Sequence, residues 1–468
     1  MEESANREIQ LAGASINNED QNTQKEANTS GGNENKNEQL IIEIREMFKR
    51  PEIQASPQYR IQKVPYDIRK WNEEAYTPQV ISIGPFHREN TRLKSMKEHK
   101  ERYFKSFIQR SRINLEDVVS TIRELEENIR GCYVETIELK SDEFVKMILV
   151  DACFILELFI RSIPESTSKS ISKSISESST SDDPMILKPM SITIMHDLLL
   201  LENQLPFFVI EKLFHLAFPF PSNAIPSFTN HQALIDLTFK YFRDNQIKTI
   251  EDYPNMEIKH FTDLLRTFML PPLKKLPKRD SPLKLLYSAT HLHEAGVKFE
   301  GVKFEVGSSE SLLDIKFEKG VLKIPRIELD DWTEILYRNI MALEQTHYLE
   351  NGYITDYIFF LDSLINTEED VDLLCENKVM VNYLGDNDAA KSMINNLNKG
   401  NFLENMRSDY HDLYKDLNSF YNNLWHRWKA TLRRQYFSNP WRTAATIAAI
   451  ILLLLTLVQT VCTIIQVV

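Results

Sequence analysis

The sequence predicts a mainly α-helical fold: one large helical domain with a small β-hairpin element, followed by one C-terminal transmembrane helix. Three observations lead to this prediction. Apolar residues recur at helical spacing through most of residues 39–424, alternation with period 2 is confined to a short stretch after residue 312, and residues 443–468 carry no charged side chain. An uncharged run of that length is typical of a membrane-spanning helix.

The chain begins with a polar tail. Residues 1–38 are rich in Glu, Asn, Gln and Ser, and a segment of this composition buries too little apolar area to offset the entropy lost on folding. We therefore expect 1–38 to be disordered and the folded domain to span 39–424. Residues 165–183 are dominated by serine and are expected to form a flexible insertion on the surface of that domain.

Three stretches of the domain show the apolar spacing of helices. Residues 98–109 and 115–129 have one apolar face each and predict amphipathic helices. Residues 144–160 are apolar on nearly every side, but they include Asp151 and Glu157 and are too short to span a bilayer. This third stretch is therefore expected to be a buried core helix.

A polar trio, Glu202-Asn203-Gln204, follows the run Leu198–Leu201 within a strongly apolar region. Polar side chains in such a setting need hydrogen-bond partners, because burying them unpaired is costly. The favoured interpretation is a hydrogen-bond network between packed helices, and the alternative is a catalytic site.

The period changes near residue 313. Leu313, Ile315 and Phe317 alternate with polar residues, and Glu318-Lys319-Gly320 supplies a turn before a second apolar alternation at 322–325. This pattern predicts a β-hairpin.

The pentapeptide GVKFE occurs twice in tandem, at 296–300 and 301–305. Side chains alternate between the faces of a strand, so a shift of five residues would place Phe299 and Phe304 on opposite faces of one unbroken strand. We therefore expect one copy to loop out, bulge or change its pairing, at Gly301.

The C-terminal run 443–468 contains about 26 residues, which give roughly 39 Å of helix against a hydrocarbon core of about 30 Å. Asn439-Pro440 has the character of an N-cap followed by a first-turn proline, so the helix is expected to start there. A buried helix of a soluble domain is the alternative interpretation, but globular helices seldom run so long without a charge.

The segment before this helix, 425–442, alternates aromatic and basic residues. Aromatic rings favour the headgroup level and basic side chains favour the cytoplasmic leaflet, which predicts a single-pass membrane protein with the bulk of its chain in the cytosol. The expected membrane is either the plasma membrane or the endoplasmic reticulum, and insertion is expected to follow synthesis, as in tail-anchored proteins. This membrane collar consists of Trp425, Arg427, Trp428, Lys429, Arg433, Arg434, Trp441 and Arg442.

Charge and cysteine usage restrict the partners. The formal net charge of −12 disfavours nucleic acid, which is a polyanion. The four cysteines are scattered without metal-type spacing, as expected of reduced thiols in a cytosolic domain. We expect membrane lipids to contact the C-terminal helix and a protein partner to bind at the cytosolic face, with no cofactor and no metal.

The sequence carries no catalytic signature. The motifs GxxxxGK, HExxH, GxSxG and GxGxxG are absent. His291 and His293 would share a face only in an extended segment, and a helix is expected there. The low-ranked catalytic candidates are His196, Asp197 and Glu202, whose apolar surroundings would raise the pKa of a carboxyl group. Enzymatic activity is therefore left open, with a structural role preferred.

Several blocks of sequence resemble the plant proteins grouped as domain of unknown function 247, the UPF 0481 group. The resemblance implies a plant protein with a mainly helical domain and a C-terminal anchor. It implies no mechanism, although some grass members are associated with self-incompatibility, a form of cell recognition. The blocks are residues 61–65, 76–87, 96–100, 197–208, 289–290 with 294–299, 338–339 with 343–345, and 436–441.

Two functions follow from these observations. The first is a membrane-tethered interaction or signalling module, with cell recognition as the process to which the resemblance points. The second is an unrecognised enzyme that acts on a membrane-associated substrate.

Overall fold

A computed structural model gives the architecture of the chain. The chain divides into two units, Met1–Gln58 and Tyr59–Val468. The description below concerns the second unit. The residues that the structure describes are 39, 41–42, 45, 61–162, 190–218, 230–242, 257–270, 279–280, 283–303, 311–401, 406–423, 428 and 440–467. The polar tail 1–38, the serine-rich run 165–183 and most of the membrane collar lie outside them.

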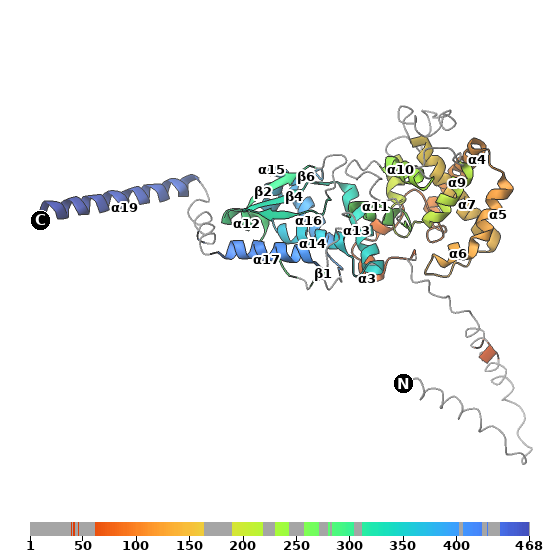
Figure 1. Cartoon of the computed structure of the whole chain (residues 1–468), viewed down its shortest axis with the longest axis horizontal. Coiled ribbons are helices and arrows are strands. Elements are labelled where there is room, and N and C mark those ends of the chain that lie inside the picture. Colours follow the sequence, from red (N-terminus) through yellow and green to blue (C-terminus); the bar gives the residue numbers. More distant parts are fainter. Residues whose placement is uncertain are drawn as a thin grey trace, which may run out of the picture. The chain divides into compact units, whose positions relative to one another are not determined.

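The first part of the described chain is helical (Figure 1). Two short 3-10 turns precede its long helices, η1 (Glu74–Tyr76) and η2 (Thr91–Met96). The helices are α3 (Tyr66–Arg69), α4 (Lys97–Ser111), α5 (Leu115–Glu124), α6 (Glu126–Gly131), α7 (Ser141–Ser162), α8 (Met190–Asp197), α9 (Phe207–Ala217), α10 (Asn230–Phe242) and α11 (Phe261–Met269).

Helix α7 is the core of this part and packs against α4, α5, α9 and α10. Its side chains are buried without interruption from Asp151 to Ile160, which confirms the predicted core helix. The two carboxylates that the sequence placed there are paired: Lys100 contacts Asp151, and Arg110 and Arg161 contact Glu157 at 3.0 and 2.7 Å. Pairing of this kind lets an apolar helix keep buried charges.

The second part combines helices with short strands. Its helices are α12 (Ala289–Ala295), α13 (Asp331–His347), α14 (Tyr353–Leu364), α15 (Glu368–Glu376), α16 (Asn387–Leu397) and α17 (Ser408–Asn422). Its strands are β1 (Arg279–Asp280), β2 (Lys298–Val302), β3 (Lys316–Glu318), β4 (Val321–Pro325), β5 (Ile327–Leu329), β6 (Met380–Asn382) and β7 (Met406–Arg407). They form a three-stranded sheet in the order β2-β4-β3 and two strand pairs, β1-β7 and β5-β6.

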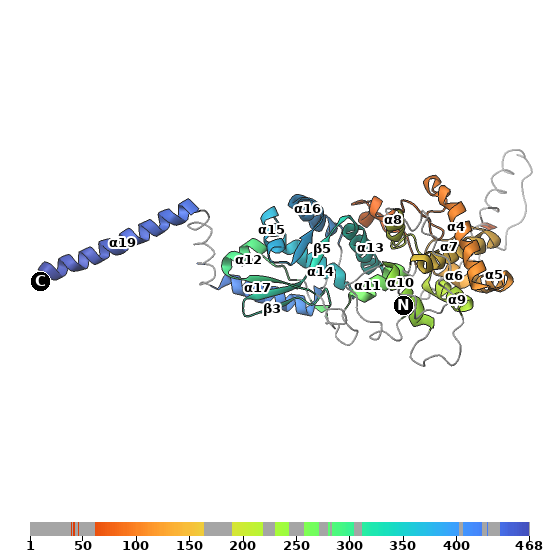
Figure 2. The ribbon, with the colours of Figure 1, turned by 90° about the horizontal axis from the view of Figure 1, so that it is seen from above.

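Helix α13 joins the two parts. It packs against α8, α11 and η1 from the first part and against α14, α16 and β5 from the second (Figure 2). A capping box starts the helix, because Asp330 accepts the N–H of Thr333 at 2.9 Å while the Thr333 hydroxyl accepts the N–H of Asp330 at 3.0 Å.

The predicted hairpin is confirmed. Strands β3 and β4 are antiparallel, with Phe317 opposite Leu322. The two residues between them, Lys319 and Gly320, have φ values of 50° and 78°. Positive φ at both positions is the signature of the turn whose twist matches a two-residue hairpin.

The expected interruption at Gly301 is wrong. Strand β2 runs parallel to β4 without a break, with Gly301 opposite Ile324 and Val302 opposite Pro325. Glycine is required there by proximity instead: a Cβ atom on Gly301 would lie 1.9 Å from the carbonyl oxygen of Lys378, and the Gly301 N–H donates to the Asn377 carbonyl at 3.0 Å. Phe304, in the second copy of the pentapeptide, lies outside the described residues.

Helix α19 (Pro440–Val467) starts at the proline singled out in the sequence. Its stretch Thr443–Ile465 is 23 residues long and apolar enough to cross a membrane, and no part of its most apolar window is buried against the protein. Within it the hydroxyls of Thr456 and Thr460 donate to the carbonyls four residues earlier, both at 2.7 Å. These polar atoms are therefore satisfied inside the helix, as an apolar surrounding demands.

Replacement of Gly301 by alanine should test the close approach of β2 to the chain at Lys378. We expect G301A to lower the free energy of unfolding by roughly 3 kcal/mol, because the new methyl group overlaps backbone atoms that cannot move aside. The matched control is G131A, in α6, where a Cβ atom meets nothing within 4 Å. Chemical denaturation should show G131A unchanged or more stable, and an equal effect of the two substitutions would contradict this account.

Candidate functional site

A buried turn, residues 198–206, joins α8 to α9 and contains the polar trio. All of its side chains are buried, including Glu202, Asn203 and Gln204, which are exposed by 3%, 1% and 1%. The trio lies in irregular backbone and not on a helix. Its partners are mainly backbone groups, several of them far away in the sequence, which the sequence pattern did not indicate.

Asp197 and Asn203 bind the backbone of the segment 79–83. One carboxylate oxygen of Asp197 accepts the N–H of Gln79 at 2.8 Å, and the other accepts those of Val80 and Ile81 at 2.7 and 2.8 Å. The side-chain oxygen of Asn203 accepts the N–H of Ile83 at 2.6 Å. No strand in the described part of the chain pairs with this segment, so two side chains supply the hydrogen bonds that a β-ladder would otherwise supply.

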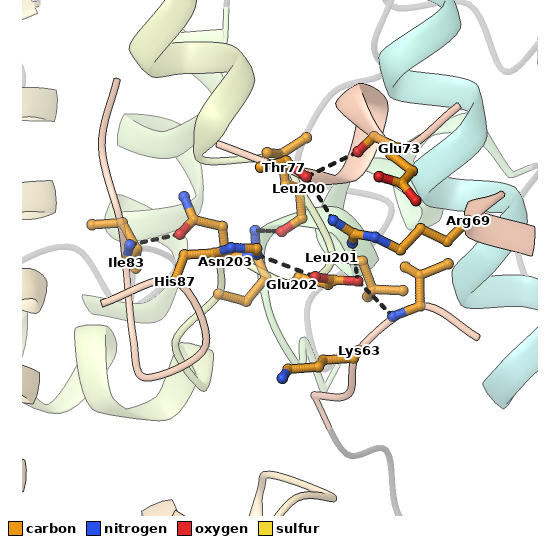
Figure 3. A network of polar contacts seen from close by, with 12 residues as sticks. Lys63, Arg69, Glu73, Thr77, Ile83, His87, Leu200, Leu201, Glu202 and Asn203 are labelled. Carbon is orange, nitrogen blue, oxygen red and sulfur yellow. Dashed lines mark hydrogen bonds and ion pairs between the residues drawn. The ribbon is translucent and has the colours of Figure 1, made fainter. Parts of the chain in front are cut away.

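Glu202 gathers cationic and neutral donors (Figure 3). Its Oε1 accepts the N–H of Val64 at 2.8 Å and the guanidinium of Arg69 at 2.6 Å, and its Oε2 lies 3.1 Å from the Nε2 of His87. Burial opposes ionisation of Glu202. The hydrogen bond with His87, the Val64 N–H and the charge of Arg69 outweigh burial and hold its pKa below the ordinary value of 4.5. Glu202 is therefore an ionised carboxylate at neutral pH.

Gln204 connects the turn to α11. Its amide nitrogen donates to the carbonyls of Leu198 and Leu200 at 2.6 and 2.9 Å, and its amide oxygen accepts the N–H of Phe261 at 3.0 Å. The carbonyl of Gln204 accepts the hydroxyl of Tyr133 at 3.0 Å. Every polar atom of this side chain is thus occupied.

Asn339 connects the turn to α13. Its oxygen accepts the N–H of Leu201 at 2.8 Å, and its nitrogen donates to the carbonyl of Ala75 at 2.7 Å. One side chain of α13 therefore holds both the turn and the chain at η1.

Lys100 and Asp151 complete the arrangement. Asp151 accepts the N–H of Gly84 at 2.9 Å and contacts the ammonium group of Lys100, which also donates to the carbonyl of Ser82 at 2.6 Å. Gly84 has φ 70°, and a Cβ atom there would lie 2.8 Å from the Gln204 carbonyl oxygen. The blocks 61–65, 76–87, 96–100, 197–208 and 338–339 thus each contribute to one network.

The three catalytic candidates have separate partners. The ring of His196 stacks on Trp332, with centroids 4.1 Å apart, whereas Asp197 and Glu202 bind the donors described above. Burial lowers the pKa of His196 to about 4 against the opposing charges of Asp330 and Asp331. Burial has the opposite effect on an acid and raises the pKa of the Asp197 carboxyl to about 6, although the hydrogen bonds from three backbone N–H groups favour its ionised form.

These contacts favour a structural role for Asp197 and Glu202 over a role in proton transfer. Both oxygens of Asp197 and of Glu202 are engaged by fixed donors, so a substrate would have to displace structural hydrogen bonds to reach either carboxylate. Among the described residues no group of three or more His, Cys, Asp or Glu side chains could hold a metal ion. In α12, His291 lies 3.2 Å from the hydroxyl of Ser288.

Of the collar residues, Trp428 is described and is exposed. Trp441 and Arg442 lie in the first turn of α19. Trp425, Arg427, Lys429, Arg433 and Arg434 lie outside the described residues, so their placement stays a sequence-based prediction.

Comparison with known proteins shows what the chain is similar to. Residues 61–455 match the family model DUF247, described as a plant protein of unknown function. The chain is 29% identical over 430 residues to UPF0481 protein At3g47200 of Arabidopsis thaliana, with 85% of this chain and 84% of that protein covered. It is 23% identical over 486 residues to putative UPF0481 protein At3g02645 of the same plant, with coverages of 85% and 88%. No solved structure matches the chain.

Replacement of Glu202 by glutamine should show what the buried carboxylate contributes. We expect E202Q to lower the free energy of unfolding at pH 7 by about 2–4 kcal/mol, because Arg69 and His87 lose their anionic partner. The control is D67N, in α3, which removes the exposed carboxylate that pairs with Lys70. It should lower the free energy of unfolding by less than about 0.5 kcal/mol.

The pH dependence of the free energy of unfolding, compared between the wild type and E202Q, gives a second readout. The folded-state pKa of Glu202 is depressed, so its contribution is complete above its unfolded-state pKa and is lost as the pH falls through the folded-state pKa. The gap between wild type and E202Q should therefore narrow as the pH falls below 4.5. A gap of constant size, measured by denaturation across this range, would show that the charge of Glu202 does not matter.

Proposed function

The chain belongs to the DUF247 family of plant proteins, and on that basis we propose that it is a single-pass membrane protein whose helical domain serves as an interaction or signalling module in the cytosol. The domain would bind a protein partner at the membrane surface. The observation that carries the proposal is helix α19, which offers 23 consecutive residues fit to cross a bilayer and buries none of its most apolar window against the protein.

An uncovered apolar helix needs a surrounding other than water. Leu452–Leu455 are exposed by 59–71%, and a contiguous apolar surface of this size is uncommon on soluble proteins. Lipid tails would supply the missing cover, and the hydroxyls of Thr456, Thr460 and Thr463 each donate to a carbonyl four residues earlier, so these three groups do not oppose insertion.

The orientation is argued from charge. The basic and aromatic residues of the membrane collar all precede the apolar stretch Thr443–Ile465 in the sequence, and basic side chains next to a span favour the cytosolic leaflet. Arg433, Arg434 and Arg442 would then contact anionic headgroups, each with about 1 kcal/mol of attraction. The net charge of −12 supports a protein partner for the domain over a nucleic acid.

An interaction role also agrees with the polar network. The strongest acid and base candidates, Asp197 and Glu202, hold segments of chain together, and His196 packs on Trp332. Rigid backbone held this way presents a fixed surface to a partner. The alternative of an enzyme centred on His196, Asp197 and Glu202 would require these separately held side chains to share a substrate.

Removal of residues 440–468 tests the anchor and the orientation together. The full chain with an N-terminal tag should fractionate with membranes, and added protease should digest the tag in sealed microsomes, because the domain faces the cytosol. The shortened chain should become soluble and lose the partners that proximity labelling finds for the full chain. Unchanged fractionation and an unchanged partner set, or a tag protected from protease, would contradict the proposal.

A further inference from the structure

Helix α19 carries its polar residues on one side. Residues three or four apart lie on the same side of a helix, because each residue turns the chain by about 100°. The four Thr and Gln residues between positions 447 and 465 all fall on one side, within roughly a third of the circumference. This polar stripe consists of Thr456, Gln459, Thr460 and Thr463, and all four residues are exposed.

The two sides of the helix differ beyond the stripe as well. Toward the N-terminus the same side continues with Ala445 and Ala449, which are one turn apart and small enough to let a second helix approach closely. The opposite side carries only branched apolar residues, which suit contact with lipid tails. These residues are Ile447, Ile451, Leu454, Val458, Val461 and Ile465.

Gln459 is the polar residue that needs a partner. It lies five residues beyond the middle of the stretch Thr443–Ile465, so its Cα atom lies about 7.5 Å from the midplane of a hydrocarbon core with a half-thickness of about 15 Å. Its backbone carbonyl accepts the hydroxyl of Thr463 at 2.8 Å, but its side-chain amide makes no hydrogen bond to the residues that the structure describes. An unpaired amide is unfavourable in a medium without water.

The threonines of the stripe differ from Gln459 in this respect. The hydroxyls of Thr456, Thr460 and Thr463 donate to carbonyls of their own helix. Lipid tails offer neither donors nor acceptors, so a partner for the Gln459 amide has to come from another helix.

A second copy of the same helix meets this requirement. Copies inserted in one orientation place Gln459 at the same depth, and an amide is self-complementary because its oxygen can accept from the NH₂ group of another amide. A helix of a different protein would need a polar group at that same depth, whereas a second copy always provides one.

The spacing along the stripe also fits a pair of helices. One seam runs along this side in alternating steps of four and three residues, which is the repeat of two helices that cross at about 20°. The seam consists of Ala445, Ala449, Leu452, Thr456, Gln459 and Thr463.

We propose that α19 forms a parallel pair with α19 of a second copy of this chain through the polar stripe, and that the two Gln459 amides are hydrogen-bonded to each other. The inference rests on the proposed membrane anchor and adds a partner within the membrane. The pair would hold two copies of the helical domain next to each other at the membrane surface.

Cysteine cross-linking of the full chain in membranes maps the contacting side. Every variant carries C462S, so that an introduced cysteine is the one thiol within Thr443–Ile465, and C462S alone gives the background from the domain. Oxidation should link T456C into dimers at least about fivefold more than L454C or V458C, because a disulfide needs Cα atoms within about 7 Å of each other. The last two positions lie on the opposite side at nearly the same depth.

The substitution Q459L tests the amide itself. Förster transfer between donor-labelled and acceptor-labelled copies of the full chain in phosphatidylcholine vesicles, measured as lipid dilutes the protein, gives the association constant. Q459L should lower this constant by about three- to tenfold, because the hydrogen bonds between the helices are lost. Q459N keeps an amide and should lower it less. The control V458L alters the opposite side and should leave the constant at its wild-type value.

Alkaline extraction separates this inference from the membrane anchor. The wild-type chain and Q459L should both stay with the membranes, and release of the wild-type chain would overturn the anchor and the pair together. If the chain stays in the membrane, three results would overturn the pair alone: equal cross-linking on both sides of α19, an association constant unchanged by Q459L, or cross-linking of T456C to a different protein in place of a second copy.

Discussion

Backbone that is buried without a strand or helix must find hydrogen-bond partners elsewhere, and this constraint organises the first part of the fold. Residues 81–84 are irregular and buried. Their N–H groups, with those of Gln79 and Val80, are taken up by Asp197, Asn203 and Asp151, apart from that of Ser82. Leaving one such group unpaired would cost about 1–3 kcal/mol. These acceptors come from the last residue of α8 (Asp197), from the turn 198–206 (Asn203) and from α7 (Asp151).

The network therefore connects residues that are far apart in the sequence. Asp151 lies 67 residues from Gly84 in sequence, and Glu202 lies 138 residues from Val64. The turn also reaches α11 through Gln204 and α13 through Asn339. Because α13 contacts α14 and α16 as well, the network ties the helices around α7 to the part that carries the strands. Its residues hold the fold together, and the proposed membrane anchor lies elsewhere, at α19.

Sequence reasoning succeeded where a single local pattern dominates. The helix around residues 144–160 and the turn at Lys319-Gly320 follow from hydrophobic period and turn chemistry, which act over a few residues. It also identified the Glu202-Asn203-Gln204 trio as polar groups that need partners. Most of the partners could not be inferred, since backbone groups such as the N–H of Val64, Ile83 and Phe261 are far away in the chain and carry no side-chain signature.

One further feature shows where local reasoning ends. The sequence predicted a break in a strand at Gly301. In the structure a glycine is needed there because the fold brings the Lys378 backbone against it. The sequence blocks that resemble the plant family, by contrast, indicated the position of the network, because several of those blocks contain its residues.

Hydrogen exchange of the segment 79–83 tests the organising role of the buried polar network most directly. In the wild-type chain the amides of Gln79, Val80, Ile81 and Ile83 should exchange slowly, because acceptors on Asp197 and Asn203 hold them. The substitution D197N places an amide NH₂ group against backbone donors, so exchange should become about tenfold faster or more relative to α14. If the amides of 79–83 exchanged equally slowly in both proteins, the segment would be held by something other than this network, and the account would be wrong.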